Sequence, residues 1–288
     1  MRGRRVTPAA IAARCVSMYQ LAAGSGEPIL FLHGMPTSGC LWNRIIERMS
    51  DRFTCIAVDL PGFGRTPRLP CGFRKLDALA ASIEALRIER GIEKWNIVGH
   101  DAGCAIGVEY AHRYPHRVDR LALLTPSIFP DLKPFYLFEI LRKPLLGEFM
   151  APAINTLFWK LVMRLALQED ANSDRKDIVH DFQTPFHGLA GAWRLMSLLR
   201  WGAPAEVLAS MPTRLTELFA PTLIFHGIRD TAVPAAFATR AAELIPDSEV
   251  VFLDSGHFLP MCEPEPIARE LSRFFVTDRR HAVQAAAD

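Results

Sequence analysis

The chain has 288 residues, of which 50% are hydrophobic and 22% are charged, and its formal net charge is +2 at pH 7. This composition fits a globular protein with one large core, and the low net charge argues against a nucleic-acid-binding surface. The six cysteines, at positions 15, 40, 55, 71, 104 and 262, show no paired spacing. We therefore expect reduced thiols and a cytoplasmic protein without a disulfide framework.

The N-terminal segment is rich in arginine: residues 1–14 contain four arginines, and no acidic residue precedes Glu27. This composition fits either a targeting segment or an irregular start of the chain, and the sequence leaves both open. The best candidate for a membrane span, residues 154–167, is interrupted by Lys160 and Arg164. We therefore expect no stable insertion into a bilayer.

Short apolar runs recur along the chain and predict strands that are buried on both faces. They lie at residues 28–34, 54–60, 96–100, 120–126, 221–227 and 249–257. Between them, residues 41–50 and 74–91 repeat apolar side chains at helical spacing. Alternating strands and helices predict an α/β fold with a mostly parallel central sheet flanked by helices.

The alternation stops between residues 127 and 211, where strand patterns are rare and Phe, Leu and Trp are frequent. An amphipathic helix is predicted there, with Ile154, Leu157, Phe158, Leu161, Val162 and Leu165 on one face and Lys160, Arg164 and Gln168 opposite. We expect a helical cap subdomain, residues 127–211, inserted into a core domain of residues 1–126 and 212–288. Basic amphipathic helices also bind lipid surfaces, which is the alternative for this helix.

A pentapeptide, Gly99-His100-Asp101-Ala102-Gly103, stands between a predicted strand and a predicted helix. A sharp turn from strand to helix exposes its apex residue, and flanking glycines allow the backbones to approach closely. The apex is Asp101, and it faces a helix N-terminus that favours an ionised carboxylate. The alternative interpretation is an aspartate that only caps the helix.

Two further polar residues follow predicted strands near the C-terminus. Asp230 follows the strand at 221–227, and His257 lies in the loop after the next strand. In a parallel sheet both loops emerge at the same edge as the turn that carries Asp101, so we expect the three side chains to meet. Asp131, which follows the strand at 120–126, is an alternative acid, but its motif context favours Asp230.

From residue 21 to residue 275 the chain resembles the α/β-hydrolase superfamily, in the aspartate-nucleophile branch of epoxide hydrolases and dehalogenases. The matching motifs are HGMP (33–36), DLPGFGRT (59–66), GHDAG (99–103), HGIRD (226–230) and SGH (255–257). The resemblance implies a catalytic triad of Asp101, Asp230 and His257, in that chain order, and an oxyanion hole made by the backbone N–H groups of Met35 and Ala102. The PGFG turn lacks the third glycine of a dinucleotide loop, and no metal-binding motif occurs, so we expect no cofactor and no metal.

An aspartate at the apex changes the expected reaction. A carboxylate attacks carbonyl groups poorly but displaces a leaving group from saturated carbon, which gives an alkyl ester of the enzyme. Water activated by His257 then hydrolyses this ester, while Asp230 orients the imidazole. Because His257 must start neutral, we expect activity to be lost below its pKa, which is about 6.5 when unperturbed.

The leaving group separates the two kinds of enzyme in this branch. A departing halide needs N–H donors. Haloalkane dehalogenases, which this chain resembles, typically have a Trp directly after the nucleophile and often an Asn in the HG-x-P loop. At these positions this chain has Ala102 and Met35, whose side chains have no donor. We therefore expect an epoxide hydrolase for a small apolar substrate, with a dehalogenase as the alternative. The expected substrate-binding residues are Tyr136, Trp159 and Trp193. Trp193 is the favoured second leaving-group donor, and His180 and His187 are alternatives.

Two non-hydrolytic functions stay open at this point, because a fold alone does not determine function. One is a receptor that holds a small apolar ligand under the cap. The other is a lyase or cyclase that uses Asp101 as a base. Apolar surface on the cap would also allow a homodimer.

Overall fold

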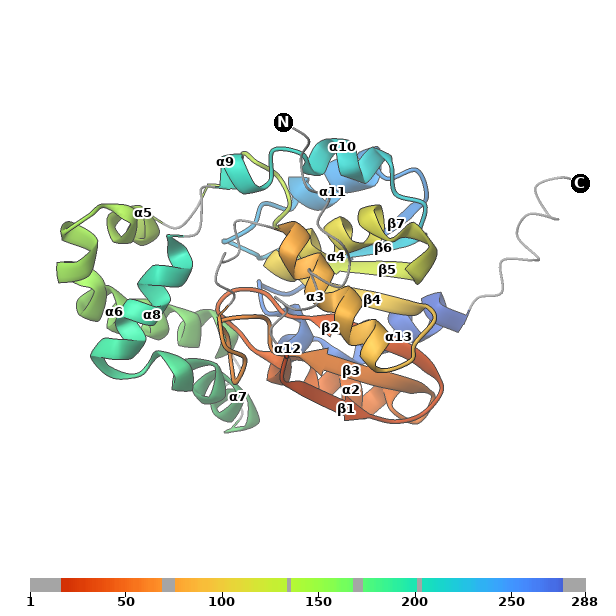
Figure 1. Ribbon diagram of the computed structural model, residues 1–288, viewed down its shortest axis with the longest axis horizontal. Coiled ribbons are helices and arrows are strands. Elements are labelled where there is room, and N and C mark those ends of the chain that lie inside the picture. Colours follow the sequence, from red (N-terminus) through yellow and green to blue (C-terminus); the bar gives the residue numbers. More distant parts are fainter. Residues whose placement is uncertain (1–16, 69–75, 134–135, 168–172, 201–203, 277–288) are drawn as a thin grey trace, which may run out of the picture.

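The computed structural model describes residues 17–68, 76–133, 136–167, 173–200 and 204–276. These residues form a seven-stranded sheet with helices on both faces and a separate helical layer over the carboxyl ends of the strands (Figure 1). We call these carboxyl ends, with the loops that follow them, the sheet edge. The strand order is β1-β3-β2-β4-β5-β6-β7, and only β1 runs antiparallel to its neighbour. The predicted α/β fold with a mostly parallel sheet is thereby confirmed.

Each of the six predicted strands is present. They are β2 (Glu27–Leu32), β3 (Phe53–Val58), β4 (Trp95–His100), β5 (Val118–Leu124), β6 (Thr222–Gly227) and β7 (Ser248–Leu253). β4 and β6 are buried at every residue, which explains their continuous apolar sequences. The sequence did not reveal β1 (Gln20–Ala23), a strand of four residues at the edge of the sheet that is only partly buried and carries no clear alternation.

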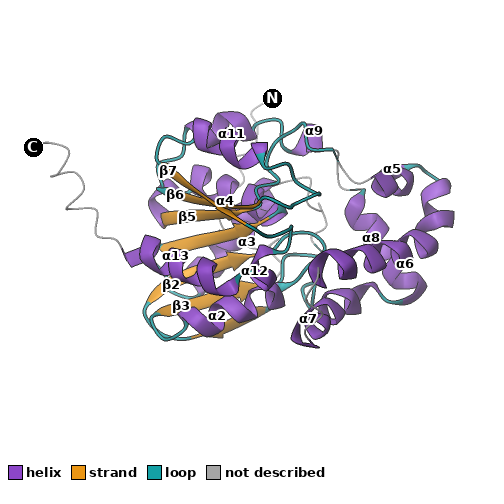
Figure 2. Cartoon of the chain, turned by 180° about the vertical axis from the view of Figure 1, so that it is seen from behind, coloured by secondary structure: helices purple, strands orange, loops and turns teal. Residues whose placement is uncertain are grey.

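Helices cover both faces of the sheet (Figures 1 and 2). On one face, α3 (Leu76–Glu89) packs on α4 (Ala102–Arg113), which in turn contacts α10 (Met211–Thr216). On the other face, α2 (Asn43–Met49) packs on α13 (Pro264–Val276), and α12 (Leu259–Cys262) contacts both. α11 (Ala236–Leu244) covers β6 and β7. The helix predicted at 41–50 corresponds to α2, which is preceded by the short helix Gly39–Trp42. The helix predicted at 74–91 corresponds to α3.

The helical layer lies between β5 and β6 in the sequence and over the carboxyl ends of the strands in space (Figure 2). It consists of α5 (Tyr136–Arg142), α6 (Leu146–Leu167), α7 (Ser173–Gln183) and α8 (Gly188–Leu199). The short helix α9 (Pro204–Val207) leads back toward the sheet. We call α5 to α8 the cap.

The long cap helix α6 is amphipathic, with one departure from the predicted face. Ile154, Phe158 and Val162 are buried, but Leu157 is 50% exposed. The buried residues repeat at intervals of four, so Leu157, one residue before Phe158, falls outside their stripe. Gln168 of the predicted polar face lies outside the described residues. Within the ranges that the structure describes, no helix is both long and apolar enough to cross a bilayer.

Two arginines join the cap to the loop after β3. Arg194 of α8 donates from Nε and Nη2 to the carbonyl oxygen of Gly62, at 3.1 and 2.8 Å. Arg68 of the same loop donates to the hydroxyl of Ser197, one turn further along α8. The cap is thus attached to the sheet by side-chain donors in addition to its two chain connections.

Candidate active site

The turn between β4 and α4 is the sharp strand-to-helix turn that the sequence predicts. Asp101 stands at its apex with φ 50° and ψ −118°, a strained conformation for a residue with a side chain. A Cβ on Gly103 would lie 2.3 Å from the carbonyl oxygen of Leu32, so only glycine allows α4 to approach β2 this closely. The Asp101 side chain makes no capping hydrogen bond to α4. The interpretation of Asp101 as a helix cap is therefore wrong.

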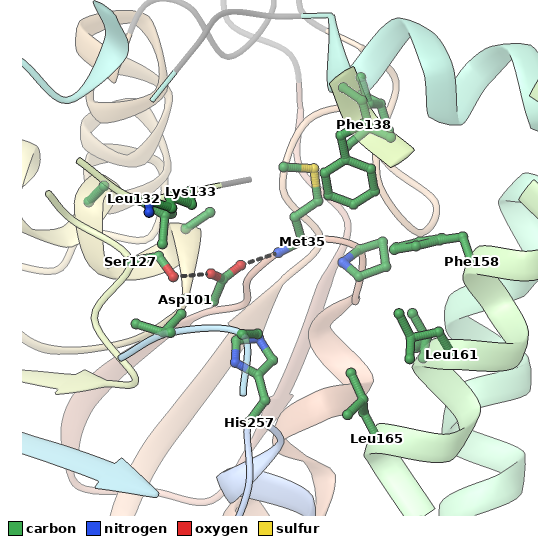
Figure 3. Close-up of a pocket in the computed structure, with 18 of the residues that line it drawn as sticks. Met35, Asp101, Ser127, Leu132, Lys133, Phe138, Phe158, Leu161, Leu165 and His257 are labelled. Atoms are coloured by element: carbon green, nitrogen blue, oxygen red, sulfur yellow. Dashed lines mark hydrogen bonds between the residues drawn. The ribbon is translucent and has the colours of Figure 1, made fainter. Parts of the chain in front are cut away.

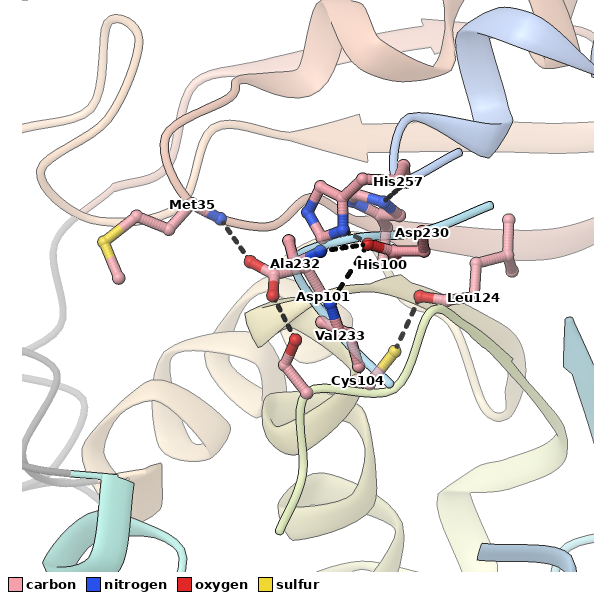
Figure 4. A network of polar contacts seen from close by, with 10 residues as sticks. Met35, His100, Asp101, Cys104, Leu124, Asp230, Ala232, Val233 and His257 are labelled. Atoms are coloured by element: carbon pink, nitrogen blue, oxygen red, sulfur yellow. Dashed lines mark hydrogen bonds and ion pairs between the residues drawn. The ribbon is translucent and has the colours of Figure 1, made fainter. Parts of the chain in front are cut away.

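Both carboxylate oxygens of Asp101 are held by donors (Figures 3 and 4). Oδ2 accepts the backbone N–H of Met35 at 2.9 Å, and Oδ1 accepts the hydroxyl of Ser127. Ala102 is the first residue of α4, so its N–H has no acceptor within the helix. Of the two amides that the sequence singled out, that of Met35 binds the carboxylate, and that of Ala102 lies at the start of the helix next to Asp101.

The loop that carries Met35 is fixed by the buried imidazole of His33. Its Nδ1 donates to the carbonyl oxygen of Gly34 at 2.7 Å, and its Nε2 accepts the N–H of Leu60 at 2.9 Å. Burial lowers the pKa of His33 to about 4, so the ring is neutral and can play both roles at once. A Cβ on Gly34 would lie 2.5 Å from Cβ of Asp101, so this loop and the turn are in direct backbone contact.

His257 and Asp230 form a buried pair beside Asp101 (Figure 4). Nδ1 of His257 donates to Oδ2 of Asp230 at 2.9 Å. The other oxygen, Oδ1, accepts the N–H groups of Ala232 at 2.7 Å and Val233 at 3.0 Å. The carboxylate is therefore held by its own loop and leaves one oxygen for the imidazole, whose Nε2 remains available to a substrate or a water molecule.

The charges of this pair shift both pKa values. Desolvation by burial lowers the pKa of His257, but the charge and hydrogen bond of Asp230 and the charge of Asp101 outweigh it, so the pKa lies above its ordinary value of 6.5. Burial raises the pKa of Asp230, but the charge of His257 and its hydrogen bonds outweigh that effect and lower it. The pair therefore favours an imidazolium next to a carboxylate.

Two other residues near His257 have different roles. His100 donates from Nε2 to the carbonyl oxygen of His257 at 2.9 Å, and burial lowers its pKa to about 4, so it is a neutral support for the loop. Asp131, the alternative acid, pairs instead with Arg240 at 2.9 Å on the surface. The geometry thus assigns the carboxylate partner of His257 to Asp230.

A cavity of about 580 Å³ opens above these residues, between the sheet edge and the cap (Figure 3). Asp101, Ala102, Met35 and His257 line its floor. Apolar side chains of the cap form the opposite wall, among them Phe138, Phe158, Leu161, Val162, Leu165 and Leu198. The site therefore combines a charged floor with a hydrocarbon roof, an arrangement suited to a small molecule with one polar group.

The cap residues expected to bind substrate are placed differently. Trp193 is 56% exposed and does not line the cavity, because α8 turns Ala192, Leu195 and Met196 inward instead. Trp159 is buried, but it stacks on Phe186 at 5.7 Å between ring centroids and also does not reach the cavity. The predictions for these two tryptophans are therefore wrong.

Three further expected residues take no described part in the cavity. The rings of His180 and His187 lie 5.7 Å apart and do not line it. The side chain of Tyr136 lies outside the described part of the structure, so its role stays a prediction.

Four polar residues that line the cavity were missed by the sequence analysis: Ser127, Lys133, Arg142 and Thr231. Ser127 and Lys133 follow β5, which pairs with β4 in parallel so that Leu124 lies beside His100. The residues after these two strands must therefore be neighbours, which is the signal that could have found Ser127. Among the residues that the structure describes, no three His, Cys, Asp or Glu side chains are grouped to hold a metal ion.

Comparison with known proteins agrees with this fold. Residues 27–264 match the sequence profile of a family described as the alpha/beta hydrolase fold. The chain is 27% identical to a haloalkane dehalogenase of Agrobacterium fabrum, over 89% of this chain and 87% of that protein. It is 26% identical to a cis-3-alkyl-4-alkyloxetan-2-one decarboxylase of Shewanella oneidensis, over 93% and 87%. A crystal structure of a haloalkane dehalogenase from Bradyrhizobium elkani superposes with a TM-score of 0.75 and 25% identity, covering 94% of this chain and 96% of that one.

Proposed function

Because the chain belongs to the α/β-hydrolase family, we propose that it is a hydrolase whose nucleophile is Asp101 and whose target is a saturated carbon atom. One observation carries this proposal: a carboxylate takes the apex of the turn, with Oδ2 on the N–H of Met35 and His257 beside it. This arrangement leaves Oδ1, which contacts Ser127, as the oxygen that attacks.

In the first step, Oδ1 bonds to the substrate carbon, and the bond from that carbon to its leaving group breaks with the electron pair going to the leaving group. The product is an alkyl ester of Asp101. No base is needed for this step, because a carboxylate nucleophile has no proton to remove. The hydrogen bonds from Met35 and Ser127 hold the carboxylate in one orientation before the substrate arrives.

In the second step, neutral His257 takes a proton from water through Nε2, and the water oxygen bonds to the carboxyl carbon of Asp101. The negative charge of the tetrahedral intermediate falls on Oδ2, next to the amides of Met35 and Ala102. Each such donor stabilises a developing oxyanion by about 3 kcal/mol. Asp230 stabilises the imidazolium, which then protonates the departing alcohol oxygen. The other proton of the water stays on the new carboxyl group, and its loss to solvent, or to the group that protonated an epoxide oxygen, restores the carboxylate.

An oxygen leaving group suits the cavity better than a halide. Halide sites use N–H donors, yet no Trp, Asn or Gln occurs among the described residues that line the cavity. The side-chain donors there are the hydroxyls of Ser127 and Thr231, the guanidinium group of Arg142, which is bonded to the cap, and the ammonium group of Lys133. Of these, the ammonium group can protonate an alkoxide, which an oxygen leaving group needs and a halide does not. We therefore propose an epoxide as substrate: ring opening and ester hydrolysis together consume one water molecule and release a diol.

A carbon–halide substrate is the second candidate, and the similarity to haloalkane dehalogenases favours it. The similarity to an oxetan-2-one decarboxylase adds a third type of electrophile, a strained lactone. In both, the same carboxylate would attack saturated carbon. The product distinguishes the first two candidates: an epoxide gives a diol, whereas a carbon–halide substrate releases halide ion.

The decisive experiment uses His257→Gln, which removes the base for the second step but leaves the nucleophile. After exposure to a 1,2-epoxyalkane, a 1-bromoalkane or a cis-dialkyl oxetan-2-one, intact-mass measurement should show one adduct, located on the peptide that contains Asp101. Its mass should be that of the substrate for the epoxide and the oxetanone, and that of the substrate less HBr for the bromoalkane. The double variant Asp101→Asn with His257→Gln is the control and should show none. A receptor or a lyase gives no adduct with any of the three, and that result would overturn the proposal.

A further inference from the structure

The size of the cavity exceeds what a small electrophile needs. Its volume of about 580 Å³ corresponds to roughly twenty water molecules at about 30 Å³ each. An epoxide ring with its two carbons accounts for only a few non-hydrogen atoms. More than half of the cavity would stay empty around a substrate such as epoxybutane, and an apolar cavity is filled most favourably by apolar atoms.

The polar groups of the cavity are concentrated at one end. Ser127, Lys133 and His257 lie around Asp101 at the sheet edge (Figure 3). The side chain of Arg142 also lines the cavity, but its Nε donates to the carbonyl oxygen of Leu199 at 3.1 Å and its Nη1 to Glu139 at 2.9 Å. Its donors are thus directed into the cap structure.

Apart from Thr231, the rest of the wall is mostly hydrocarbon from several elements, and one continuous part of it follows the axis of α6. Phe158, Leu161, Val162 and Leu165 of α6 line the cavity over about two helical turns. Figure 3 shows Phe158, Leu161 and Leu165 one above the other, facing the Asp101 side across the cavity. A row of apolar side chains along a helix offers continuous contact to an extended chain.

We propose that the substrate is a long unbranched hydrocarbon, roughly ten carbons or more, that carries its electrophilic group at one end. This inference rests on the proposed function for the head group, which lies at Asp101, while the tail lies against α6. It replaces the small substrate expected from the sequence. Because burying one methylene group contributes about 0.8 kcal/mol, each added carbon should tighten binding about three- to fourfold until the cavity is full.

Binding to the inert variant Asp101→Asn tests the tail without requiring turnover. Isothermal titration with 1,2-epoxyalkanes from epoxybutane to epoxydodecane, and with the 1-alkanols of the same lengths, should give a dissociation constant that falls about three- to fourfold per carbon. A dissociation constant that is independent of length, or no binding of any member, would contradict the proposal.

Two variants of α6 locate the tail. Leu161→Trp fills the cavity wall and should weaken binding of epoxydodecane at least about tenfold while leaving epoxybutane unchanged, because overfilling displaces only the tail. Thr156→Trp, at an exposed position of the same helix roughly opposite the cavity-lining face, is the matched control and should change neither. Equal losses for both ligands, or equal losses in both variants, would overturn the assignment of the tail to α6.

Failure of this proposal can be distinguished from failure of the proposed covalent mechanism. If the length dependence appears but His257→Gln forms no adduct, the cavity binds long chains and the covalent mechanism is wrong. If the adduct forms but affinity does not depend on length, the mechanism stands and the substrate class is wrong.

Discussion

The sheet edge and the cap meet at the same cavity, but they hold their residues there by different means. At the sheet edge, Asp101, Asp230 and His257 are fixed by strand ends and by hydrogen bonds from the backbone, such as those of Ala232 and Val233 to Asp230. In the cap, residues reach the cavity only through the rotation of a helix and the packing of its neighbours. The first kind of placement follows from local sequence, whereas the second depends on the whole fold.

The largest expected effect concerns the acid that pairs with His257. Asp230 follows β6 and Asp131 follows the neighbouring strand β5, so each can be replaced in turn. Asp230→Asn should lower kcat about 10³- to 10⁴-fold, because the amide no longer orients His257 or stabilises its charge. Asp131→Asn, which loses only a surface pair with Arg240, should leave kcat unchanged. Steady-state kinetics on an accepted substrate measures both, and a larger loss for Asp131→Asn would reverse the assignment of the acid.

The pH dependence of the two steps probes the same site with a smaller effect. Since the pKa of His257 lies above 6.5, turnover should fall about tenfold per pH unit below a midpoint that is higher than 6.5. Ester formation needs no base, so the adduct on Asp101 should accumulate in the wild-type protein as the pH falls. Rapid quenching followed by intact-mass measurement detects it. Adduct that diminishes in parallel with turnover would show that His257 acts in the first step.

The same shift has a consequence for stability. A raised folded-state pKa means that protonated His257 stabilises the fold below about 6.5 and that this contribution is lost as the pH rises through the folded-state value. In the proposed mechanism the ring must be neutral, so activity should rise in the pH range where this contribution disappears. The interaction with Asp230 makes His257 a stronger base but narrows the pH range in which the ring is neutral.

The cap is tested by two tryptophans that differ in placement. Trp159→Ala should lower the free energy of unfolding by about 3 kcal/mol, because a buried ring that stacks on Phe186 leaves a cavity. Trp193→Ala should change it by less than about 0.5 kcal/mol, since that ring is largely exposed. Urea unfolding followed by circular dichroism measures both. A marked loss of substrate affinity in Trp193→Ala would reinstate that residue in the site.

Much of the sheet and its edge could be predicted because the responsible patterns are local. Continuous apolar runs marked six strands, and the glycines around Asp101 marked the turn. The strand β1 escaped because four partly exposed residues at an edge carry no clear pattern. Its pairing with β3 depends on residues more than thirty positions away.

The errors in the cap have a different physical origin. Sequence spacing places Trp193 on a helix, but which side of α8 faces the cavity is decided by the packing of Leu195 and Met196. Trp159 is apolar and buried, yet its neighbour Phe158 takes the position at the cavity wall. Helix periodicity indicates that a face is buried, and only the assembled structure distinguishes burial in a core from burial against a ligand.

The hydrogen bond from Met35 to Asp101 has a consequence for chemical inhibition. A serine at the apex would have a single side-chain oxygen, the nucleophile itself, and would leave this amide to receive an oxygen from an incoming acyl or phosphonyl reagent. Here the resting enzyme already places its own carboxylate oxygen there, 2.9 Å from the nitrogen. Reagents such as fluorophosphonates and trifluoromethyl ketones, which depend on that vacancy and on a hydroxyl nucleophile, should leave this protein unmodified, whereas alkylating electrophiles should label it.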